Sequence, residues 1–546
     1  MLLKTAALSV FIASVALAQP APRSERDYWA ETQLGFDATL NGEISDQTCY
    51  QQQRVFRGCL AGLHAGLSVL RSYSAKGVLP GERGVLPGFI GSDADATDYR
   101  ALAIAAWARV SPPQRRPSFT AALAALKNLV PAGDLPWATA RALNGYLGIA
   151  IDPHTAIMPM AVRDQLEQAA RVNGRFGITF ALPEVEGRPM LIISQIDPAA
   201  PSREQLRVGD VFISINGVAG NAIELLQAMS SLQNMRVVVE NADGRREVDM
   251  RRGPITDSNV EASLLEHAGL KTALIKLASY MPANTCQDIG QKIQAQLRAG
   301  ARSLVLDLRN NGGGRVDQAM CLISMFLEEG AFLWRDFNIH QGHGTQVRRP
   351  RGPRILQDIP TVVLVNGSSA SASEVTATYL QAYGKGIVVG ENTFGKGSMQ
   401  MNGAYPRNQR VVMSLTTGLY YGPNGVSPQL IGVTPDVEVF PLLGQTAPTE
   451  FKRERDLYPD AIPNEVNAPR DPAREARNQR LTDCLARDAG EEVLTAGLNA
   501  YEARVLDLQL ATAKAILKCH KTEGMAWPRG IEIPSVPMPG PMRDMR

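Results

Sequence analysis

The sequence has few metal-binding residues and little excess charge. Its 546 residues include six histidines, which are scattered, and six cysteines, none of which stands in a C-x-x-C pair. A metal site is therefore not expected. The 56 basic and 54 acidic residues give a net charge of +2, so the composition does not call for a nucleic-acid partner.

Long apolar runs are missing after the N-terminus. Residues 1–18 contain Lys4, an apolar stretch from Ala6 to Leu17 and a small-residue triplet that ends at Ala18. This is the pattern of a secretory signal peptide, and the stretch is short for a transmembrane helix. The sequence predicts an exported protein, periplasmic or extracellular, with a signal peptide at residues 1–18. An uncleaved N-terminal anchor is the alternative.

The cysteines of an exported chain are expected to form disulfides. Six cysteines allow about fifteen pairings, so the sequence alone does not fix the connectivity. Their spacing suggests local pairs, each within one region of the chain: Cys49–Cys59, Cys286–Cys321 and Cys484–Cys519.

The most informative stretch is residues 361–400. It begins with a β-branched apolar run, continues through a Gly/Ser turn into a helical pattern, and then reaches a second apolar run. Strand, turn, helix and strand form an α/β unit, and open α/β sheets carry their chemistry at the carboxyl ends of strands. Ser371 lies at such an end, where the helix begins.

Each notable residue of this stretch also has a plain structural interpretation. Ser371 and Glu374 have the spacing of a capping box at a helix start. Lys396, between two glycines, is compatible with a solvated turn. The segment from Gly390 to Lys396 is close to a phosphate-binding loop, but that motif requires Ser or Thr after the lysine, and Gly397 stands there.

The sequences NGSSASASE (366–374) and GENTFGKGSMQ (390–400) resemble the active-site region of the C-terminal processing peptidases, also called tail-specific proteases. These are serine peptidases that use a lysine as base. In that family the nucleophile precedes the lysine by 25 positions and a glutamine follows the lysine by four, and both intervals occur here. The resemblance implies that Ser371, Lys396 and Gln400 are catalytic.

This assignment is chemically coherent. A serine hydroxyl needs a base to take its proton, and a free lysine, with a pKa of about 10.4, is protonated at neutral pH. Desolvation lowers a lysine pKa, and the neighbours Phe394 and Met399, with no acidic residue close behind Glu391 in the sequence, suit such a site. If the segment is extended, Gln400 lies on the same face as Lys396.

A glycine-rich loop precedes this stretch in the sequence SLVLDLRNNGGG (303–314). It lacks the G-x-G-x-x-G pattern of a nucleotide loop. The resemblance implies that it supplies one N–H of an oxyanion hole, from Gly313, while Ala372 supplies the other. The interval to Ser371 contains extra residues around 339–354, so the choice among the glycines stays open.

The sequence LRVGDVFISINGV (206–218) resembles the signature of PDZ domains. Such domains bind chain ends by strand addition, with backbone N–H groups on the terminal carboxylate. The resemblance places the binding loop at Phe176, Gly177 and Ile178. The D-P-H-T turn at 152–155 is expected to be structural and receives no chemical role.

We therefore predict an α/β (mixed α+β) fold with an open protease sheet, flanking helices and an inserted β-rich domain. The resemblance covers Tyr146 to Val439. Helical N- and C-terminal regions flank it, and the C-terminal helical part is a candidate to pack on the N-terminal region, within one subunit or across a homodimer. The expected regions are the signal peptide (1–18), a helical N-terminal region (19–172), a PDZ domain (173–254), a Ser-Lys peptidase core (255–440) and a C-terminal extension (441–546), helical and then disordered.

The resemblance implies an exported serine endopeptidase that needs no cofactor. Its substrates would be proteins or peptides with exposed C-termini, recognised by the PDZ domain and hydrolysed through an acyl-enzyme. The alternative is a catalytically inactive PDZ scaffold or adaptor that binds peptides.

Overall fold

The structure is a computed structural model, which describes part of the chain. The described residues are 25–34, 58–69 with gaps, 130–163, 176–253 with short gaps, 259–327, 332–338, 342–348, 355–405, 408–441, 453–458, 461–462, 472–488 and 506–523. The expected signal peptide (1–18) and the expected disordered end of the chain lie outside these residues. In the part of the chain that is described, no helix combines the length and the apolar character that crossing a membrane requires.

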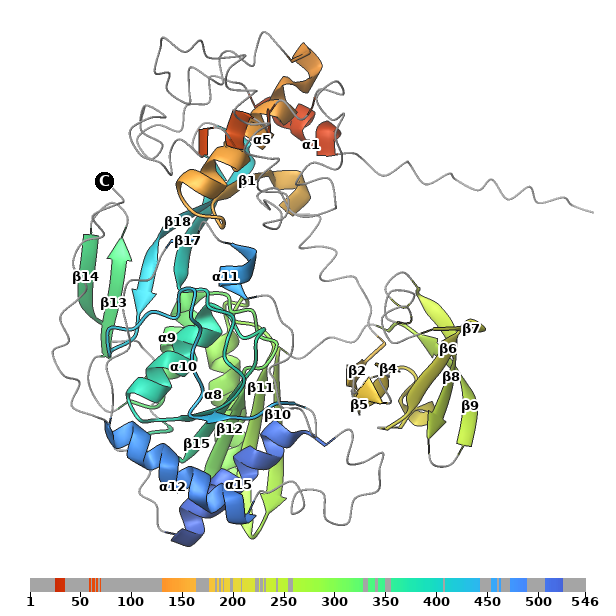
Figure 1. Ribbon diagram of the computed structural model, residues 1–546, viewed down its shortest axis with the longest axis vertical. Helices are drawn as coiled ribbons and strands as arrows, with labels where there is room; N and C mark the ends of the chain where they lie inside the picture. The colour runs from red at the N-terminus through yellow and green to blue at the C-terminus, as the bar shows by residue number, and fades with distance from the viewer. Residues whose placement is uncertain are drawn as a thin grey trace, which may run out of the picture.

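A six-stranded sheet forms the centre of the molecule, in the order β10-β11-β12-β15-β16-β19 (Figure 1). Its strands β11, β12, β15, β16 and β19 run parallel to one another, and β10 pairs antiparallel with β11. Their bounds are Val260–His267 (β10), Leu270–Leu277 (β11), Ser303–Asp307 (β12), Thr361–Val365 (β15), Ile387–Gly390 (β16) and Val437–Glu438 (β19). Every residue of β12, β15 and β16 is buried, as in parallel strands that are covered on both faces. The predicted α/β class is confirmed.

Three helices cover one face of this sheet. They are α8 (Thr285–Arg298), α9 (Val316–Ser324) and α10 (Ala372–Ala382). Each follows one parallel strand and precedes the next in the sheet, and right-handed crossovers place successive helices on the same face. Alternate strand residues, such as Leu306 and Val363, pack against these helices in the largest core of the molecule.

The C-terminal helices α12 (Pro472–Asp488) and α15 (Leu508–Glu523) cover the opposite face. There the other alternate residues, Val362 and Leu364 among them, pack against Leu481 and Ile516. For these two helices the expectation of packing on the N-terminal region is wrong. They pack instead on the second apolar face of the central sheet, because a parallel sheet must be covered on both faces.

Buried ion pairs fix the two helices at the sheet. Arg309, directly after β12, donates to the Asp507 carboxylate before α15 at 2.7 and 2.8 Å. Asp436, before β19, accepts from Arg474 and Arg477 of α12, each at 2.7 Å. Since both carboxylates have most of their surface buried and are hydrogen-bonded to guanidinium groups, these contacts specify where the helices dock.

A second sheet carries the N-terminal region. It has the order β1-β18-β13-β14, with β17 paired to β18, and consists of β1 (Ala156–Pro159), β13 (Phe332–Asn338), β14 (Gly342–Arg348), β17 (Ser398–Tyr405) and β18 (Asn408–Tyr421). Helices α1 (Glu25–Thr32) and α5 (Leu135–Ala150) pack on it through a core that includes Trp29, Leu143 and Val411. A 3-10 turn, η1 (Ala132–Asp134), precedes α5. Part of the extra sequence around 339–354 forms β14.

A third, small sheet has a core of its own and lies apart from the central sheet in Figure 1. Its order is β2-β5-β6-β8-β9, with β7 paired to β6. The bounds are Ile178–Ala181 (β2), Ile192–Ile196 (β5), Val211–Ile215 (β6), Val218–Ala219 (β7), Asn234–Asn241 (β8) and Gly244–Arg251 (β9), beside a small ladder of Glu184–Val185 (β3) with Arg188–Pro189 (β4) and a 3-10 turn, Arg203–Gln205 (η2). The β-rich character predicted for this region is present, and most of residues 222–232 lie outside the described residues.

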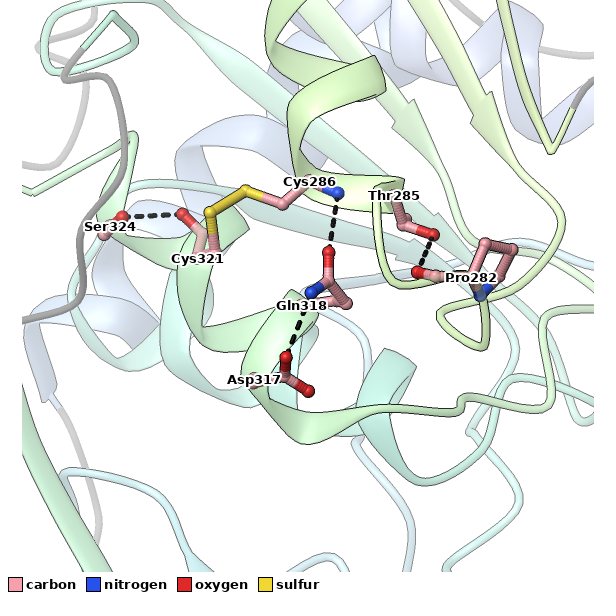
Figure 2. The surroundings of a disulfide bond; sticks show 7 residues. All are labelled: Pro282, Thr285, Cys286, Asp317, Gln318, Cys321 and Ser324. Atoms are coloured by element: carbon pink, nitrogen blue, oxygen red, sulfur yellow. Dashed lines mark hydrogen bonds between the residues drawn. A yellow bond between two sulfur atoms is a disulfide. The ribbon is translucent and has the colours of Figure 1, made fainter.

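Two of the three expected disulfides are present in the structure. Cys286 of α8 is bonded to Cys321 of α9, where Gln318 also accepts a hydrogen bond from the Cys286 N–H at 3.0 Å (Figure 2). Cys484 of α12 is bonded to Cys519 of α15 and joins the helices that cover the second face of the central sheet. The expected partner of Cys59 is Cys49, which lies outside the described residues, so that pair stays a prediction.

We expect the Cys484→Ser/Cys519→Ser variant to be destabilised by about 4 kcal/mol, because the bond closes a loop of 35 residues in the unfolded chain. Denaturant unfolding of the oxidised protein and the variant measures this difference. The matched control is Cys286→Ser/Cys321→Ser, which opens a loop of the same 35-residue separation elsewhere in the core. Equal stability of the wild type and the C-terminal variant would show that this bond does not constrain the chain.

Candidate active site

Three loops at the carboxyl ends of β12, β15 and β16 carry the predicted site residues. Gly313 follows β12, Ser371 follows β15 and Lys396 follows β16. Because parallel neighbours end at the same edge of a sheet, these loops meet there, as expected for an open α/β sheet. Figure 1 shows this edge beside α11 (Glu454–Leu457), a short helix from the C-terminal segment.

Ser371 has an unusual backbone conformation. It is the N-cap residue of α10 and has a φ of 54°, which lies in the left-handed region that residues other than glycine seldom adopt. Such a conformation costs about 1–3 kcal/mol and persists only where the surroundings enforce it. The turn therefore holds the serine in one fixed orientation at the helix start.

The neighbouring serines are used differently. Ser369 and Ser373 are buried, and their hydroxyl groups donate to the carbonyl oxygens of Leu308 at 2.9 Å and Asn311 at 2.8 Å. Ser371 is only partly buried and is the N-cap residue of α10, where it forms the predicted capping box with Glu374. Of these three hydroxyl groups, that of Ser371 is therefore the one that is not committed to a backbone carbonyl.

Glu374 ties the serine turn to the lysine loop. Its buried carboxyl accepts hydrogen bonds from the N–H groups of Ser371 (2.8 Å), Gly395 (2.7 Å) and Lys396 (2.8 Å) and from the Thr393 hydroxyl (2.5 Å). The contact with the Ser371 N–H is the glutamate half of the predicted capping box. Burial raises the pKa of Glu374 to about 7, while the four hydrogen bonds act to lower it.

The side chain of Lys396 is held by a chain of hydrogen bonds. Its Nζ donates to Oε1 of Gln400, and Nε2 of Gln400 donates to Oγ of Ser398 at 2.9 Å and to Oγ1 of Thr416 at 3.1 Å. The Thr416 hydroxyl in turn donates to the buried carboxylate of Asp152 at 2.9 Å. The two hydroxyl oxygens that accept from Gln400 fix its amide so that the amide oxygen faces the lysine amine, which orients the amine without adding a charge next to it.

Burial lowers the pKa of Lys396 from its usual value, and nearby carboxyl groups oppose this effect. Glu454 opposes it most, followed by Asp152 and Glu374. The sequence close behind Glu391 has no acidic residue, so these carboxyl groups were not apparent from it. The fold brings in all three carboxyl groups from other elements, and Glu454 comes from the C-terminal segment, for which no role was predicted.

Tyr420 of β18 is a further residue that sequence reasoning missed. Its hydroxyl lies 3.1 Å from the carbonyl oxygen of Ser371 and 3.2 Å from that of Lys396, and its N–H donates to the Gly397 carbonyl at 3.0 Å. The buried tyrosine therefore braces the serine turn and the lysine loop against each other. No local sequence pattern marks it, because it is one apolar strand position among many.

The predicted oxyanion residues lie beside the serine. A Cβ on Gly313 would come within 2.8 Å of both the Ala372 nitrogen and the Ser371 Cβ, so only glycine fits there. Ala372 occupies the first turn of α10, where backbone N–H groups have no partner within the helix. The N–H of Gly313, however, donates to Oδ1 of Asn311 at 2.9 Å, so in this structure a side chain occupies it.

The predicted peptide-binding residues are not brought together with Ser371. Phe176, Gly177 and Ile178 lead into β2 of the small sheet, whereas Ser371 belongs to the central sheet. Phe176 is buried in the small core beneath the Arg252 guanidinium, 4.8 Å from its ring centre. Gly177 has a φ of 73°, which glycine adopts without strain.

No group of three potential metal-binding side chains occurs in the portion of the chain that is described. The Lys396 amine, the Gln400 amide and the Ser398 and Thr416 hydroxyl groups instead form a hydrogen-bonded chain. Such an arrangement is suited to acid–base chemistry.

Known proteins are similar to this chain over the same region. Residues 271–439 match Peptidase family S41. The carboxy-terminal-processing protease of Bartonella bacilliformis is 28% identical over 57% of this chain and 70% of its own length, and the chloroplastic C-terminal processing peptidase of Tetradesmus obliquus is 28% identical over 59% and 72%. The solved structure of a photosystem II D1 C-terminal processing protease has 23% identity and a TM-score of 0.37, covering 70% of this chain and 92% of that one.

These similarities and the central sheet define a serine-type peptidase. Residues 271–439 thus resemble peptidase family S41, the chain is similar to C-terminal processing peptidases, and the resemblance predicted from residues 366–400 is confirmed at this level.

Proposed function

We propose that this peptidase hydrolyses peptide bonds by a Ser-Lys mechanism in which Ser371 is the nucleophile and Lys396 the base. The observation that carries the proposal is the hydrogen bond from Lys396 Nζ to Gln400 in a site where burial lowers the lysine pKa. The strained Ser371 turn and the Glu374 contacts to both loops support it.

In this mechanism the neutral amine of Lys396 takes the proton from the Ser371 hydroxyl as its oxygen attacks the peptide carbonyl carbon. The C–N bond then breaks, and the lysine ammonium gives its proton to the leaving amine. Water enters, and Lys396 takes a proton from it while its oxygen attacks the acyl carbon. The ester bond to Ser371 breaks, the lysine returns the proton to the serine oxygen, and the second product leaves as a carboxylic acid.

The developing oxyanion would be bound by backbone N–H groups. Ala372 would supply one of them from the start of α10, where the helix also favours negative charge. Gly313 has the required proximity, but its N–H would have to exchange the Asn311 oxygen for the substrate oxygen. The glycine loop would therefore adjust when substrate binds.

We further propose that the small sheet (residues 173–254) is a PDZ domain that captures the C-terminal tail of an unfolded or tagged protein. Supporting features are its separate core and the glycine turn before β2, next to which a peptide strand can add. With the N-terminal sequence, this makes the protein an exported endopeptidase that processes proteins with exposed C-termini. The proposed regions are those given above, and a homodimer through the terminal regions belongs to the same proposal.

The test is the turnover of one unstructured peptide with a free C-terminal carboxylate and of the same peptide with a C-terminal amide. We expect the free acid to be cleaved with a kcat/KM about tenfold higher, because hydrogen bonds to a charged group contribute about 1.5–3 kcal/mol. An N-terminally acetylated peptide is the control and should match the free acid. Equal rates for acid and amide would contradict tail recognition, and cleavage of neither would favour the inactive-scaffold alternative.

A further inference from the structure

The helix α11 brings a buried glutamate to the lysine loop. The N–H of Glu454 donates to the Phe394 carbonyl at 3.0 Å, and a Cβ on Gly395 would lie 3.5 Å from the Glu454 Cβ. Both positions directly precede Lys396 in the chain. The Glu454 residue has no exposed surface. A residue of the C-terminal segment is therefore part of the wall of the proposed active site.

One oxygen of this carboxyl group is satisfied and the other is not. Oε1 lies 2.7 Å from Nε2 of His154, whereas Oε2 is buried and has no hydrogen-bond partner among the described residues. The imidazole packs on the Tyr458 ring, with 4.7 Å between the ring centres. The backbone N–H of His154 donates to Oδ1 of Asp152 at 3.0 Å, which fixes the turn that carries the imidazole. A buried carboxylate oxygen without a donor is costly, so a missing donor is expected at this place.

The Lys396 ammonium would provide that donor after a movement of its side chain, since its charge acts on the Glu454 carboxyl group but the two make no direct hydrogen bond. An ammonium has three N–H groups, and the hydrogen bond to Gln400 uses one of them. The other carboxyl groups near the lysine already have hydrogen-bond donors. Glu374 accepts from four groups, and Asp152 accepts from Thr416 and from backbone N–H groups. Of these three carboxyl groups, Glu454 is therefore the one that has an oxygen, Oε2, without a donor.

We propose that Glu454 is the counter-ion of the Lys396 ammonium, so that the C-terminal segment sets the pH at which the lysine becomes a base. This rests on the proposed Ser-Lys mechanism and adds a positioning residue to it. The carboxylate would stabilise the ammonium that forms when the amine takes the serine proton. It would also hold that proton on the lysine in the resting enzyme.

The surroundings favour this assignment. Burial raises the pKa of Glu454 to about 8, while the lysine ammonium lowers it, and the Glu454 carboxylate in turn raises the pKa of Lys396 against the effect of burial. Burial, together with the lysine charge, lowers the pKa of His154 to about 3, so this imidazole is neutral and adds no competing charge. The remaining titratable or charged groups that face the pair are Glu374 of α10, Asp152 of the turn after α5, Tyr420 of β18 and Tyr458 at the end of α11.

The test is the pH profile of kcat/KM for Glu454→Gln, which keeps a partner for His154 but is uncharged at every pH. Removing an opposite charge lowers a lysine pKa, so the midpoint of the rise with pH should move down by about 1 unit. The plateau should fall about threefold or more, because a weaker base takes the serine proton less readily. Asp456→Asn is the matched control: it removes one charge from the same helix at an exposed position and should leave the midpoint unchanged.

The outcomes separate a charge effect from a packing effect. A purely structural glutamate would give a lower rate and a lower melting temperature with an unchanged midpoint, which would overturn the proposal, as would an upward shift. Glu454→Met tests the same charge loss with an apolar side chain and should shift the midpoint in the same direction. If Lys396→Arg retains near-normal turnover, the Ser-Lys mechanism itself fails. If that variant is inactive and Glu454→Gln has the wild-type midpoint, only the counter-ion role fails.

Discussion

Replacement of Ser371 by alanine is expected to abolish the cleavage of an unstructured peptide, with a loss of kcat of about 10⁴-fold or more. The hydroxyl of Ser371 contributes at most a helix cap, whose loss costs about 0.5–2 kcal/mol, so the fold should survive its removal. The strain at its φ of 54° remains, since alanine has a Cβ as well. Steady-state turnover, with a thermal melt to verify folding, measures the effect.

Ser369→Ala and Ser373→Ala are the matched controls. Each loses a buried hydrogen bond to a backbone carbonyl, so each should cost about 1–3 kcal/mol of stability while keeping most of the activity. The three variants thus dissociate chemistry from folding. Full activity of Ser371→Ala would restore the interpretation of this serine as a helix cap and nothing more.

Replacement of Lys396 by arginine should be as damaging, by about 10³-fold or more, because a guanidinium does not lose its proton at working pH. In the wild type, burial lowers the pKa of Lys396, so the neutral base accumulates as the pH rises through that value. Activity should therefore rise with pH, with a midpoint below the value of about 10.4 for a free lysine. Initial rates across the alkaline limb, measured for both proteins, test this.

Lys396→Met is the control for misfolding. A buried arginine is always charged, so Lys396→Arg would lose activity if that charge unfolded the site. Methionine is neutral and similar in length, so this variant should be inactive and at least as stable as the wild type at neutral pH. Between the folded and unfolded pKa of the lysine, the unfolded chain binds more protons, so wild-type stability should increase with pH while that of the methionine variant should not. Near-normal turnover of Lys396→Arg would mean that the residue supplies only charge.

Local patterns were sufficient to predict several strands of the central sheet and strand β6 of the small sheet. The apolar runs of β12, β15 and β16 and the alternation of β6 are properties of short segments, and the turns between them contain diagnostic glycines. The location of the C-terminal helices was not predictable in this way. Val362 and Leu364 are as apolar as Val363 and Val365, which indicates that both faces of β15 are buried. The local sequence does not indicate which distant segment packs on the second face.

The candidate site shows the same division. Ser371, Lys396 and Gln400 were marked by their spacing, and the structure places the last two in contact. The sequence did not predict the other residues of the site, Glu454, His154 and Tyr420. They come from three separate segments, and none of them belongs to a recognisable pattern in its own segment. The contact between His154 and Glu454 spans 300 positions and is created only by tertiary folding. Which Gly N–H faces a substrate was also beyond local reasoning, since it depends on the side chain of Asn311.

The position of α12 and α15 bears on when the enzyme becomes active during synthesis. A ribosome makes Ser371 and Lys396 well before it makes Ile516 and Cys519, so a growing chain holds the proposed catalytic pair while one face of its sheet is still bare. The Arg309 contact with Asp507 and the Cys484–Cys519 disulfide can form only after residues 507–519 have emerged. Stable proteolytic activity should therefore appear only once the C-terminal helices have been made, and the nascent chain would be spared from cutting its neighbours.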